Sequence, residues 1–167
     1  KLQAELGLST KQEAEELFNQ YHERVPFVRD LMNTTSRWAS REGEIRTLLG
    51  RGCRFNKWEP AHFGMHVPMT WEDAMKKYGE NRIRRAFTYK ALNKLIQGSA
   101  ADMTKKSMLD LYKEGIIAHI QIHDELDISV ESDKKAKRIV QIMESAVELE
   151  IPNKVDYESG KNWGEIH

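Results

Sequence analysis

Two adjacent carboxylates follow a histidine at His123-Asp124-Glu125, between two largely apolar stretches of the chain. Ile116 to Ile122 is rich in β-branched residues and Leu126 to Val130 alternates between apolar and polar residues, so the pattern predicts two strands that meet at a tight turn. Both acids are ionised near pH 7 and repel each other, so a cationic group is expected at the turn. Acids are also common in ordinary exposed turns, and the turn alone leaves both interpretations open.

The composition sets the limits for the rest of the chain. Its 167 residues, 40% of them hydrophobic, can build the core of one domain or of two small ones. No apolar run is as long as a membrane span, and the first residues lack the character of a signal peptide. We therefore expect a soluble, cytoplasmic protein with no membrane partner. Cys53 is the single cysteine, which excludes an intrachain disulfide and is compatible with a reducing compartment.

Charges balance over the whole chain, with 26 Lys and Arg against 26 Asp and Glu, but their distribution is uneven. From Arg37 to Lys57 basic residues greatly outnumber acids, and from Lys76 to Lys94 Glu80 is the only acid. The two ends of the chain are acidic. Contact with a polyanion is therefore expected to be confined to the middle of the chain.

Two helices joined by a tight turn are predicted for the first forty residues. Thr10 and Glu13 form a capping-box pattern, and the helix that follows is expected from about Lys11 to Glu23. Pro26 opens a second helix that ends at Gly43, a residue suited to a helix C-terminus. The apolar stripe on each helix is expected to be core.

A strand, a glycine-containing turn and a second strand are predicted from Ile45 to Phe55. Backbone freedom at Gly50 and Gly52, together with the forked guanidinium donors of the arginines that project from the turn region, suits phosphate binding. Ordinary solvated charge explains the same residues equally well.

The segment between this turn and the next long helix carries few signals. His62 and His66 lie near Cys53, but a fourth ligand and the spacing typical of a zinc site are lacking. Thr70 is expected to cap a short helix that Gly79 ends.

One continuous helix is predicted from about Arg82 to Lys113, because apolar residues stay in phase through Gly98. A second stripe on this helix holds Tyr89, Asn93 and Gln97, spaced four residues apart. These uncharged side chains can donate hydrogen bonds from one face. The stripe is either an exposed polar face or a reader of base edges.

After the acidic turn, Ser132 is expected to cap a helix that Pro152 prevents from continuing. Lys154 to Tyr157 then alternates like a strand. The second half of the chain is therefore expected to be α+β, with a small antiparallel sheet under helices.

Four groups of residues, in this order and spacing, resemble the C-terminal portion of family A DNA polymerases, the bacterial polymerase I type. They are Arg84-Arg85-Ala86, Asn93 with Gln97-Gly98-Ser99-Ala100-Ala101-Asp102, Gln121-Ile122-His123-Asp124-Glu125-Leu126, and Glu158-Ser159-Gly160-Lys161-Asn162-Trp163. Upstream, Thr47-Leu48-Leu49-Gly50-Arg51 resembles the Gly-Arg turn of the family's fingers, and Leu2 to Val28 resembles the helices after its nucleotide-binding helix. Only a segment from about Asn56 to Gly79 looks like a longer insert.

The resemblance implies a template-directed polymerase that adds deoxynucleoside triphosphates to a primer by a two-metal mechanism. Asp124 would be a bridging ligand of two Mg²⁺ ions, with Glu125 as a lesser contributor and His123 orienting the primer end. Mg²⁺ prefers oxygen ligands and phosphates over a closed protein cage, and Mn²⁺ is expected to substitute for it.

The resemblance also implies a set of contacts with primer-template DNA. Amide donors of Asn93 and Gln97 would contact minor-groove acceptors that every correct base pair presents, and so would check pair geometry without reading sequence. Arg51 and Arg54 would hold backbone phosphates. The remaining residues that the resemblance places near DNA are Thr47, Arg85 and Lys90. The family's usual basic residue in this region aligns with Tyr89, which leaves only Lys90 beside it.

Residues 1–81 are expected to be part of the fingers subdomain and residues 82–167 the C-terminal part of the palm. No part of the chain resembles the family's motif for the second metal-binding aspartate or its triphosphate-binding helix. We therefore interpret the chain as one piece of a polymerase that is encoded split, cleaved or shortened, and that works with an upstream polymerase chain. A phage origin, and hence the host cytoplasm, would fit by analogy.

Two other functions stay open. A fragment of a single-subunit RNA polymerase would share the palm and the His-Asp pair, although Glu125 and the Gln97-Gly98 helix favour the DNA enzymes. A non-catalytic DNA-binding remnant is also compatible, because one carboxylate without its partner cannot build a two-metal site.

Overall fold

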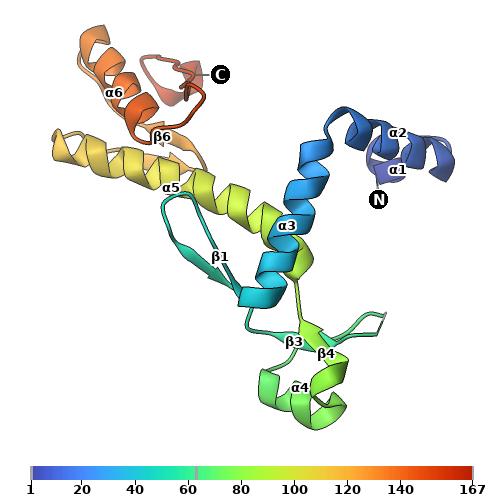
Figure 1. Ribbon diagram of the computed structural model, residues 1–167. Coiled ribbons are helices and arrows are strands. Elements are labelled where there is room, and N and C mark those ends of the chain that lie inside the picture. The colour runs from blue at the N-terminus through green and yellow to red at the C-terminus, as the bar shows by residue number, and fades with distance from the viewer. Residues whose placement is uncertain (1, 63, 167) are drawn as a thin grey trace. The chain divides into compact units, whose positions relative to one another are not determined.

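The computed structural model describes residues 2–62 and 64–166, and these divide into two compact units (Figure 1). The first unit contains the residues up to Arg46 together with Gly50–Leu95. The second contains Thr47–Leu49 and the residues from Ile96 onward. The fold is α+β, as predicted, and the strands within the described residues form three separate antiparallel pairs.

The first unit begins with three helices, α1 (Leu2–Glu5), α2 (Lys11–Arg24) and α3 (Pro26–Glu42). The predicted capping box is present, because the Thr10 side chain accepts from the Glu13 amide at 3.2 Å while Glu13 Oε2 accepts from the Thr10 amide at 3.2 Å. Gly43 ends α3 with a φ of 73°, a left-handed conformation that glycine adopts without a steric penalty.

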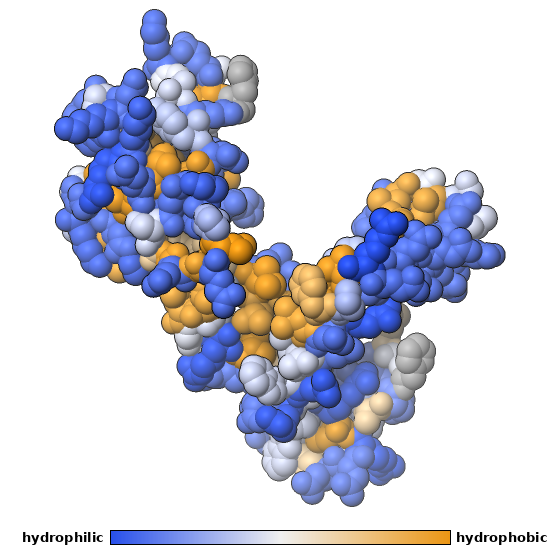
Figure 2. All heavy atoms as spheres, turned by 45° about the horizontal axis from the view of Figure 1, so that its top comes forward, coloured by the Kyte–Doolittle hydropathy of each residue, from blue (hydrophilic) through white to orange (hydrophobic). Residues whose placement is uncertain are grey.

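The apolar stripes of α2 and α3 are less buried than predicted. Ala14 and Ala39 are buried, but the large side chains of Leu17, Phe18, Tyr21, Phe27 and Trp38 are between 42% and 66% exposed. The prediction that both stripes are core is therefore wrong for these side chains. Apolar side chains also appear in orange on the face of the molecule shown in Figure 2.

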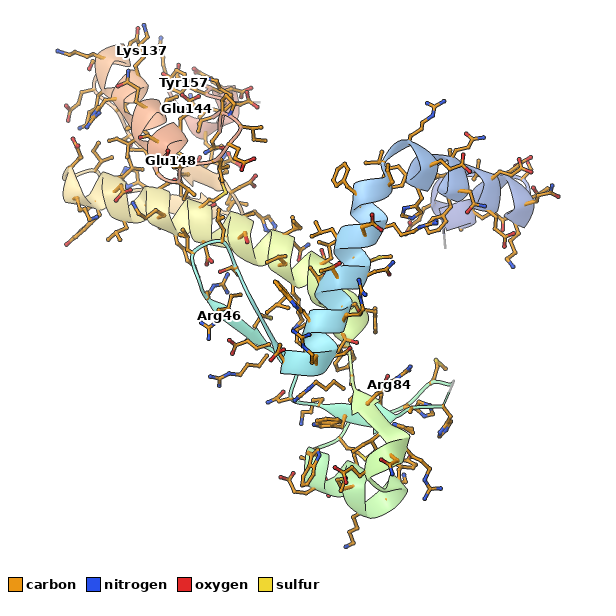
Figure 3. All side chains as sticks on the ribbon, in the orientation of Figure 1. Arg46, Arg84, Lys137, Glu144, Glu148 and Tyr157 are labelled. Atoms are coloured by element: carbon orange, nitrogen blue, oxygen red, sulfur yellow. The ribbon has the colours of Figure 1, made fainter. Side chains whose placement is uncertain are left out.

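Two strand pairs complete the first unit. β1 (Glu44–Arg46) pairs with β2 (Gly52–Arg54), which confirms the predicted strand-turn-strand. β3 (Trp58–Pro60) pairs with β4 (Ile83–Arg85), with α4 (Trp71–Tyr78) and a short 3-10 helix (Glu80–Arg82) between them. Arg46 projects from β1, and Arg84 on β4 contacts Glu59 on β3 at 2.9 Å (Figure 3). The Thr70 cap and the Gly79 end of α4 are as predicted.

The long helix α5 (Ala91–Lys113) starts later than predicted. The prediction placed its start near Arg82, but Ile83–Arg85 is a strand that pairs with Trp58–Pro60, and Phe87 has a φ of 64°, which is incompatible with a right-handed helix. A short 3-10 helix (Thr88–Lys90) then leads into α5. Its continuity through Gly98 and its end at Lys113 were predicted correctly.

The second unit places a hairpin beside a helix. β5 (Ile120–Ile122) pairs with β6 (Glu125–Asp127), and α6 (Asp133–Ser145) follows with Ser132 as its cap. Lys154–Tyr157 is not a strand, contrary to the prediction. The Val155 amide instead donates to Glu144 Oε1 at 3.3 Å, so this segment bonds to α6 rather than to a neighbouring strand.

Each unit has a small apolar cluster of its own. In the first unit, the buried residues Ala39, Ile45, Phe55 and Ala91 pack together. In the second, the cluster consists of Leu111, Ile116, Ile139 and Ile142. Among the described helices, none is long and apolar enough to cross a membrane.

Candidate functional site

The acidic turn joins β5 and β6 in the second unit. Ile122 pairs with Glu125, so the turn consists of His123 and Asp124, and Glu125 is the first residue of β6. The sequence predicted all three residues in the turn, and the strands are shorter than expected. The side chains of His123, Asp124 and Glu125 are all exposed, which leaves both carboxylates accessible to a ligand.

The backbone of the turn has an uncommon conformation at His123. Its φ is 53°, in the left-handed region where histidine is found more often than most non-glycine residues. Gln121 Nε2 donates to the His123 carbonyl at 2.8 Å and so supports the turn from β5. Residues held in this region often cluster at functional sites, because the surrounding structure must stabilise them.

The hairpin is anchored through one of its faces. Leu126 and Ile128 pack against the cluster formed by Leu111, Ile116, Ile139 and Ile142. Since side chains alternate along a strand, Glu125 and Asp127 lie on the opposite face from Leu126. The hairpin is thus fixed to the second unit by apolar packing while its turn stays open to solvent.

The amide side chains of Asn93 and Gln97 lie four residues apart on α5, and both are exposed. Lys90 precedes the helix, and its ammonium lies 5.1 Å from the centre of the Phe87 ring and 5.7 Å from that of Tyr89. These three side chains keep the accessibility that DNA contact requires. That contact stays a prediction for each of them.

Thr47 and Asp102 form a buried hydrogen bond within the second unit. Thr47 is 6% exposed and Asp102 is 7% exposed, and the Thr47 hydroxyl donates to Asp102 Oδ2. The Leu48 amide also donates to Ser99 Oγ at 2.9 Å. These two contacts fix the Gly-Arg turn on α5, so the Thr47 side chain is engaged in the fold, and its contact with DNA stays a prediction.

The arginines of the β1–β2 pair are grouped around one carboxylate. Arg46 Nη2 lies 2.6 Å from Glu44 Oε1, and Arg54 Nε lies 3.5 Å from Glu44 Oε2. Arg46 Nη1 also donates to the Gly50 carbonyl at 3.0 Å. Arg51 and Arg54 are both exposed, so their predicted phosphate contacts are sterically feasible.

The Arg85 side chain makes its contacts with other residues of the first unit. Its Nη1 donates to the Phe55 carbonyl at 2.9 Å, and its guanidinium lies 4.7 Å from the centre of the Trp58 ring. A Cβ atom at Gly43 would come within 2.5 Å of this guanidinium. These contacts hold Arg85 inside the unit, and its predicted contact with DNA has no support from them.

The described residues supply some of the ligands that a divalent metal ion needs, but not a complete metal site. Within residues 2–62 and 64–166, no group of three or more His, Cys, Asp or Glu side chains could hold a metal ion. Asp124 and Glu125 supply two exposed carboxylates, which suit Mg²⁺ because this ion keeps several waters and binds through one or two carboxylates and substrate phosphates. His62 and His66 contact each other edge to face, with ring centres 4.6 Å apart.

Sequence reasoning missed three side chains that support these residues, namely Gln121, Asp102 and Glu44. Gln121 and Asp102 lie within the motifs on which the resemblance is based. Their hydrogen-bond partners, the His123 carbonyl and the Thr47 hydroxyl, become apparent only in the folded chain. Glu44 had a detectable signal, because it is an acid among several arginines in the sequence, and the structure pairs it with Arg54 in the β1–β2 register.

The sequence profile of DNA polymerase family A matches residues 1–165. The chain belongs to this family. A DNA-directed DNA polymerase of Pseudomonas phage M6 is 35% identical over 152 residues, which is 91% of this chain and 20% of that relative. DNA polymerase I of Borreliella burgdorferi is 30% identical over 176 residues, 100% of this chain and 17% of that relative. The family A chain thus spans about a fifth of the length of such relatives or less.

A solved structure of the same family has a similar fold. It is the POL domain of Pol1 from M. smegmatis in complex with a DNA primer-template and dNTP. The match has a TM-score of 0.65 and 26% sequence identity, and it covers 90% of this family A chain and 25% of that chain.

Proposed function

We propose that the chain is the C-terminal fingers and palm part of a polymerase that adds deoxynucleotides to a primer 3′ end on a DNA template. The observation that carries the proposal is the exposed His123-Asp124 turn with Glu125 beside it, in a chain that matches a polymerase family over residues 1–165. The M. smegmatis relative, which is bound to primer-template and dNTP, supports the same substrates.

The remainder of the polymerase fold is proposed to complete the site. Asp124 and Glu125 alone do not make a closed metal cage, and the family relatives are about five times longer than this chain. A further carboxylate and the triphosphate-binding residues would come from that upstream part. Fingers would comprise residues 1–81 and the palm part residues 82–167.

Asp124 and Glu125 would hold the two Mg²⁺ ions, with Asp124 as the principal ligand. When bound, such ions make the primer hydroxyl a better nucleophile and offset the charge of the triphosphate. The accessible Asp124 carboxylate sits at the tip of the hairpin, where a primer end and a nucleotide can both approach. His123, held by its own backbone and by Gln121, would orient the primer end.

The proposed DNA contacts would be of two kinds, hydrogen bonds to base edges and ionic contacts with phosphates. The neutral amides of Asn93 and Gln97 would contact minor-groove acceptors, which are similar in all four base pairs. The cations of Arg51, Arg54 and Lys90 would contact backbone phosphates, which fix the position of the duplex without reading its sequence.

The test is primer extension by this chain combined with the remaining part of the polymerase. Asp124→Ala should lower turnover by several orders of magnitude and leave primer-template binding largely intact, because a metal ligand is lost from the reacting centre. Glu125→Ala should cost much less, and Asp156→Ala, an exposed acid outside the hairpin, should have no effect. The chain alone is expected to extend no primer.

Several outcomes would contradict the proposal. Equally mild effects of Asp124→Ala and Glu125→Ala would show that the hairpin is not catalytic. Extension by the chain alone would show that no upstream part is needed. A preference for ribonucleotides would favour an RNA polymerase, and DNA binding without extension in the complete assembly would favour a non-catalytic role.

A further inference from the structure

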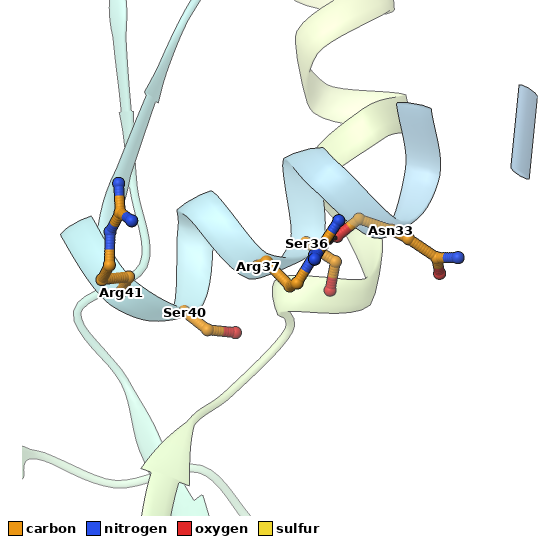
Figure 4. A pocket seen from close by; sticks show the side chains of 5 residues that line it. All are labelled: Asn33, Ser36, Arg37, Ser40 and Arg41. Atoms are coloured by element: carbon orange, nitrogen blue, oxygen red, sulfur yellow. Dashed lines mark hydrogen bonds between the residues drawn. The ribbon is translucent and has the colours of Figure 1, made fainter. Parts of the chain in front are cut away.

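The loop between β3 and α4 carries a pair of imidazole rings that the proposed polymerase site does not use. His62 and His66 belong to the segment that looks like a longer insert, and their ring centres lie 4.6 Å apart with the ring planes at 80°. The open pocket on α3 (Figure 4) offers no comparable ligands, because amide, hydroxyl and guanidinium groups line it, namely those of Asn33, Ser36, Arg37, Ser40 and Arg41. The imidazole pair is therefore the stronger candidate for a further site.

A hydrogen bond to the backbone fixes where one of the rings carries its proton. His66 Nε2 lies 3.1 Å from the His62 carbonyl oxygen, and a carbonyl can only accept, so Nε2 is the donor. In the neutral ring, His66 Nδ1 then keeps a lone pair that can bind a metal ion. Histidine ligands commonly donate their other N–H to a backbone carbonyl in this way, and the hydrogen bond fixes both the tautomer and the orientation of the ring.

The separation of the two rings fits two ligands of one ion. A bond between zinc and an imidazole nitrogen is about 2.0–2.1 Å long, which puts the ring centre about 3.2 Å from the ion. Two rings bound at an angle of about 90–110° would then have centres about 4.5–5.2 Å apart. The pair, at 4.6 Å, therefore has the separation that two ligands of one ion require.

Gly64, between the two histidines, lets the His66 ring lie against the backbone of the loop. Gly64 has a φ of 148°, which residues with a side chain rarely adopt. A Cβ atom at this position would lie 3.2 Å from His66 Cε1 and 3.3 Å from His66 Nε2. The glycine thus leaves room for the ring that the backbone hydrogen bond orients.

The surroundings of the rings select the kind of ion. Within the part of the chain that the structure describes, no third His, Cys, Asp or Glu joins the pair in a metal-binding group. The Tyr78 ring lies 6.4 Å from the His62 ring, and the Lys77 ammonium lies 5.2 Å from the centre of the Tyr78 ring. A hard ion such as Mg²⁺ prefers oxygen ligands and gains little beside a lysine. Imidazole nitrogens instead suit transition metals such as Zn²⁺, Ni²⁺ and Cu²⁺.

We propose that His62 and His66 bind a divalent transition-metal ion, with Zn²⁺ as the representative, through His66 Nδ1 and a ring nitrogen of His62. Water fills the remaining positions of the ion, because two imidazoles do not complete a tetrahedral site. The pair belongs to the first unit and uses nitrogen ligands, whereas Asp124 belongs to the second and offers carboxylate oxygens. Zn²⁺ binding requires no catalysis, so this proposal can fail while the polymerase function stands, and the reverse also holds.

The experiment is a calorimetric titration of this chain with Zn²⁺ in a buffer that contains excess Mg²⁺. His62→Gln and His66→Gln should each lower the Zn²⁺ affinity by more than about 10-fold, because loss of a ligand should cost at least as much as loss of a group that orients one. His119→Gln, an exposed histidine outside the insert, is the matched control and should change the affinity little.

Gly64→Ala tests the geometry while both imidazoles stay present. The added Cβ should displace the His66 ring and lower the Zn²⁺ affinity about 10- to 100-fold, as expected for a ligand whose orientation is disturbed. Circular dichroism melting would establish that each variant is folded. In the same measurement, Zn²⁺ at about 100 times its Kd should raise the melting temperature of the unaltered chain but not that of His62→Gln/His66→Gln.

Absence of saturable Zn²⁺ binding to the folded chain, or unchanged binding in the double histidine variant, would overturn the proposal. Binding that is lost in Asp124→Ala and kept in the double variant would assign the ion to the acidic turn instead. Displacement of Zn²⁺ by equimolar Mg²⁺ would contradict the assignment to a transition metal.

Discussion

The Thr47 hydroxyl donates to the Asp102 carboxylate across 55 residues of sequence, with both side chains buried. The bond joins the Gly-Arg turn to the middle of α5, and the contact between the Leu48 amide and Ser99 Oγ reinforces it one residue further on. The motif that begins at Thr47 and the motif that contains Ser99 and Asp102, which are far apart in the sequence, are therefore in direct contact in the fold. The position of the turn therefore depends on a side-chain hydrogen bond that is buried from solvent.

Replacement of Thr47 by valine should lower the free energy of unfolding by about 1–3 kcal/mol, because a buried carboxylate loses a donor while the side-chain shape is kept. Thr47→Ser retains the hydroxyl and is the matched control. Urea denaturation followed by circular dichroism is the measurement. Equal midpoints for the valine and serine variants would show that the hydrogen bond contributes nothing.

Gly43→Ala should destabilise the first unit more than Gly50→Ala. Both glycines have a positive φ, 73° and 85°, which an alanine would adopt at a cost of about 1–2 kcal/mol. A Cβ at Gly43 would also lie 2.5 Å from the Arg85 guanidinium, whereas a Cβ at Gly50 would point into open space. Arg85 is held by the Phe55 carbonyl and by Trp58, so it cannot move away freely. The check is a comparison of the two melting temperatures, and similar values would contradict the close approach.

The stability of α5 should depend on pH through Asp110. A hydrogen bond from Lys106, followed by one from Lys113 at 3.1 Å, holds the pKa of Asp110 below its ordinary value of 3.8. Because the folded-state pKa is depressed, the stabilisation is present above the unfolded value and is lost as the pH falls through the folded value. The chain should therefore be more stable than Asp110→Asn near pH 7, and the difference should vanish in strong acid.

Urea midpoints of the two proteins between about pH 7 and pH 2.5 would measure this difference. High salt should reduce it, because exposed ion pairs are screened. A difference that persists unchanged at the lowest pH would exclude Asp110 ionisation as its cause.

Gln97→Ala should slow nucleotide incorporation by the complete polymerase about 5- to 150-fold, if loss of its amide leaves a minor-groove acceptor unpaired at a cost of about 1–3 kcal/mol in the transition state. Template sequence should matter little, because the acceptors are common to all four base pairs. Gln141→Ala, an exposed glutamine on α6, is the control.

Single-turnover extension on each terminal pair, and on a primer whose terminal purine N3 is replaced by carbon, would measure the effect of Gln97→Ala. A defect confined to one base pair, or an undiminished rate, would assign the Asn93 and Gln97 stripe to an ordinary solvated helix face.

The sequence by itself determined the elements that depend on near neighbours. The Thr10 capping box, the Gly43 helix end, the Thr70 cap and the Ser132 cap all agree with the structure. Each depends on a hydrogen bond or a backbone conformation within about four residues, so the local residue types are sufficient to predict it. The paired strands around His123 are predictable for the same reason, since a tight turn brings them together.

Only the tertiary structure decided the features that join distant segments. The sequence prediction included Ile83–Arg85 in the long helix, but these residues pair with Trp58–Pro60 as a strand, and α5 starts at Ala91. Likewise, the bond between Thr47 and Asp102 and the engagement of Arg85 with Phe55 and Trp58 have no local signal. The free energy of such contacts depends on which segments fold against each other. A segment can therefore adopt a conformation that its local propensity does not favour, when pairing with a distant segment gives more of its backbone N–H and C=O groups a hydrogen-bond partner.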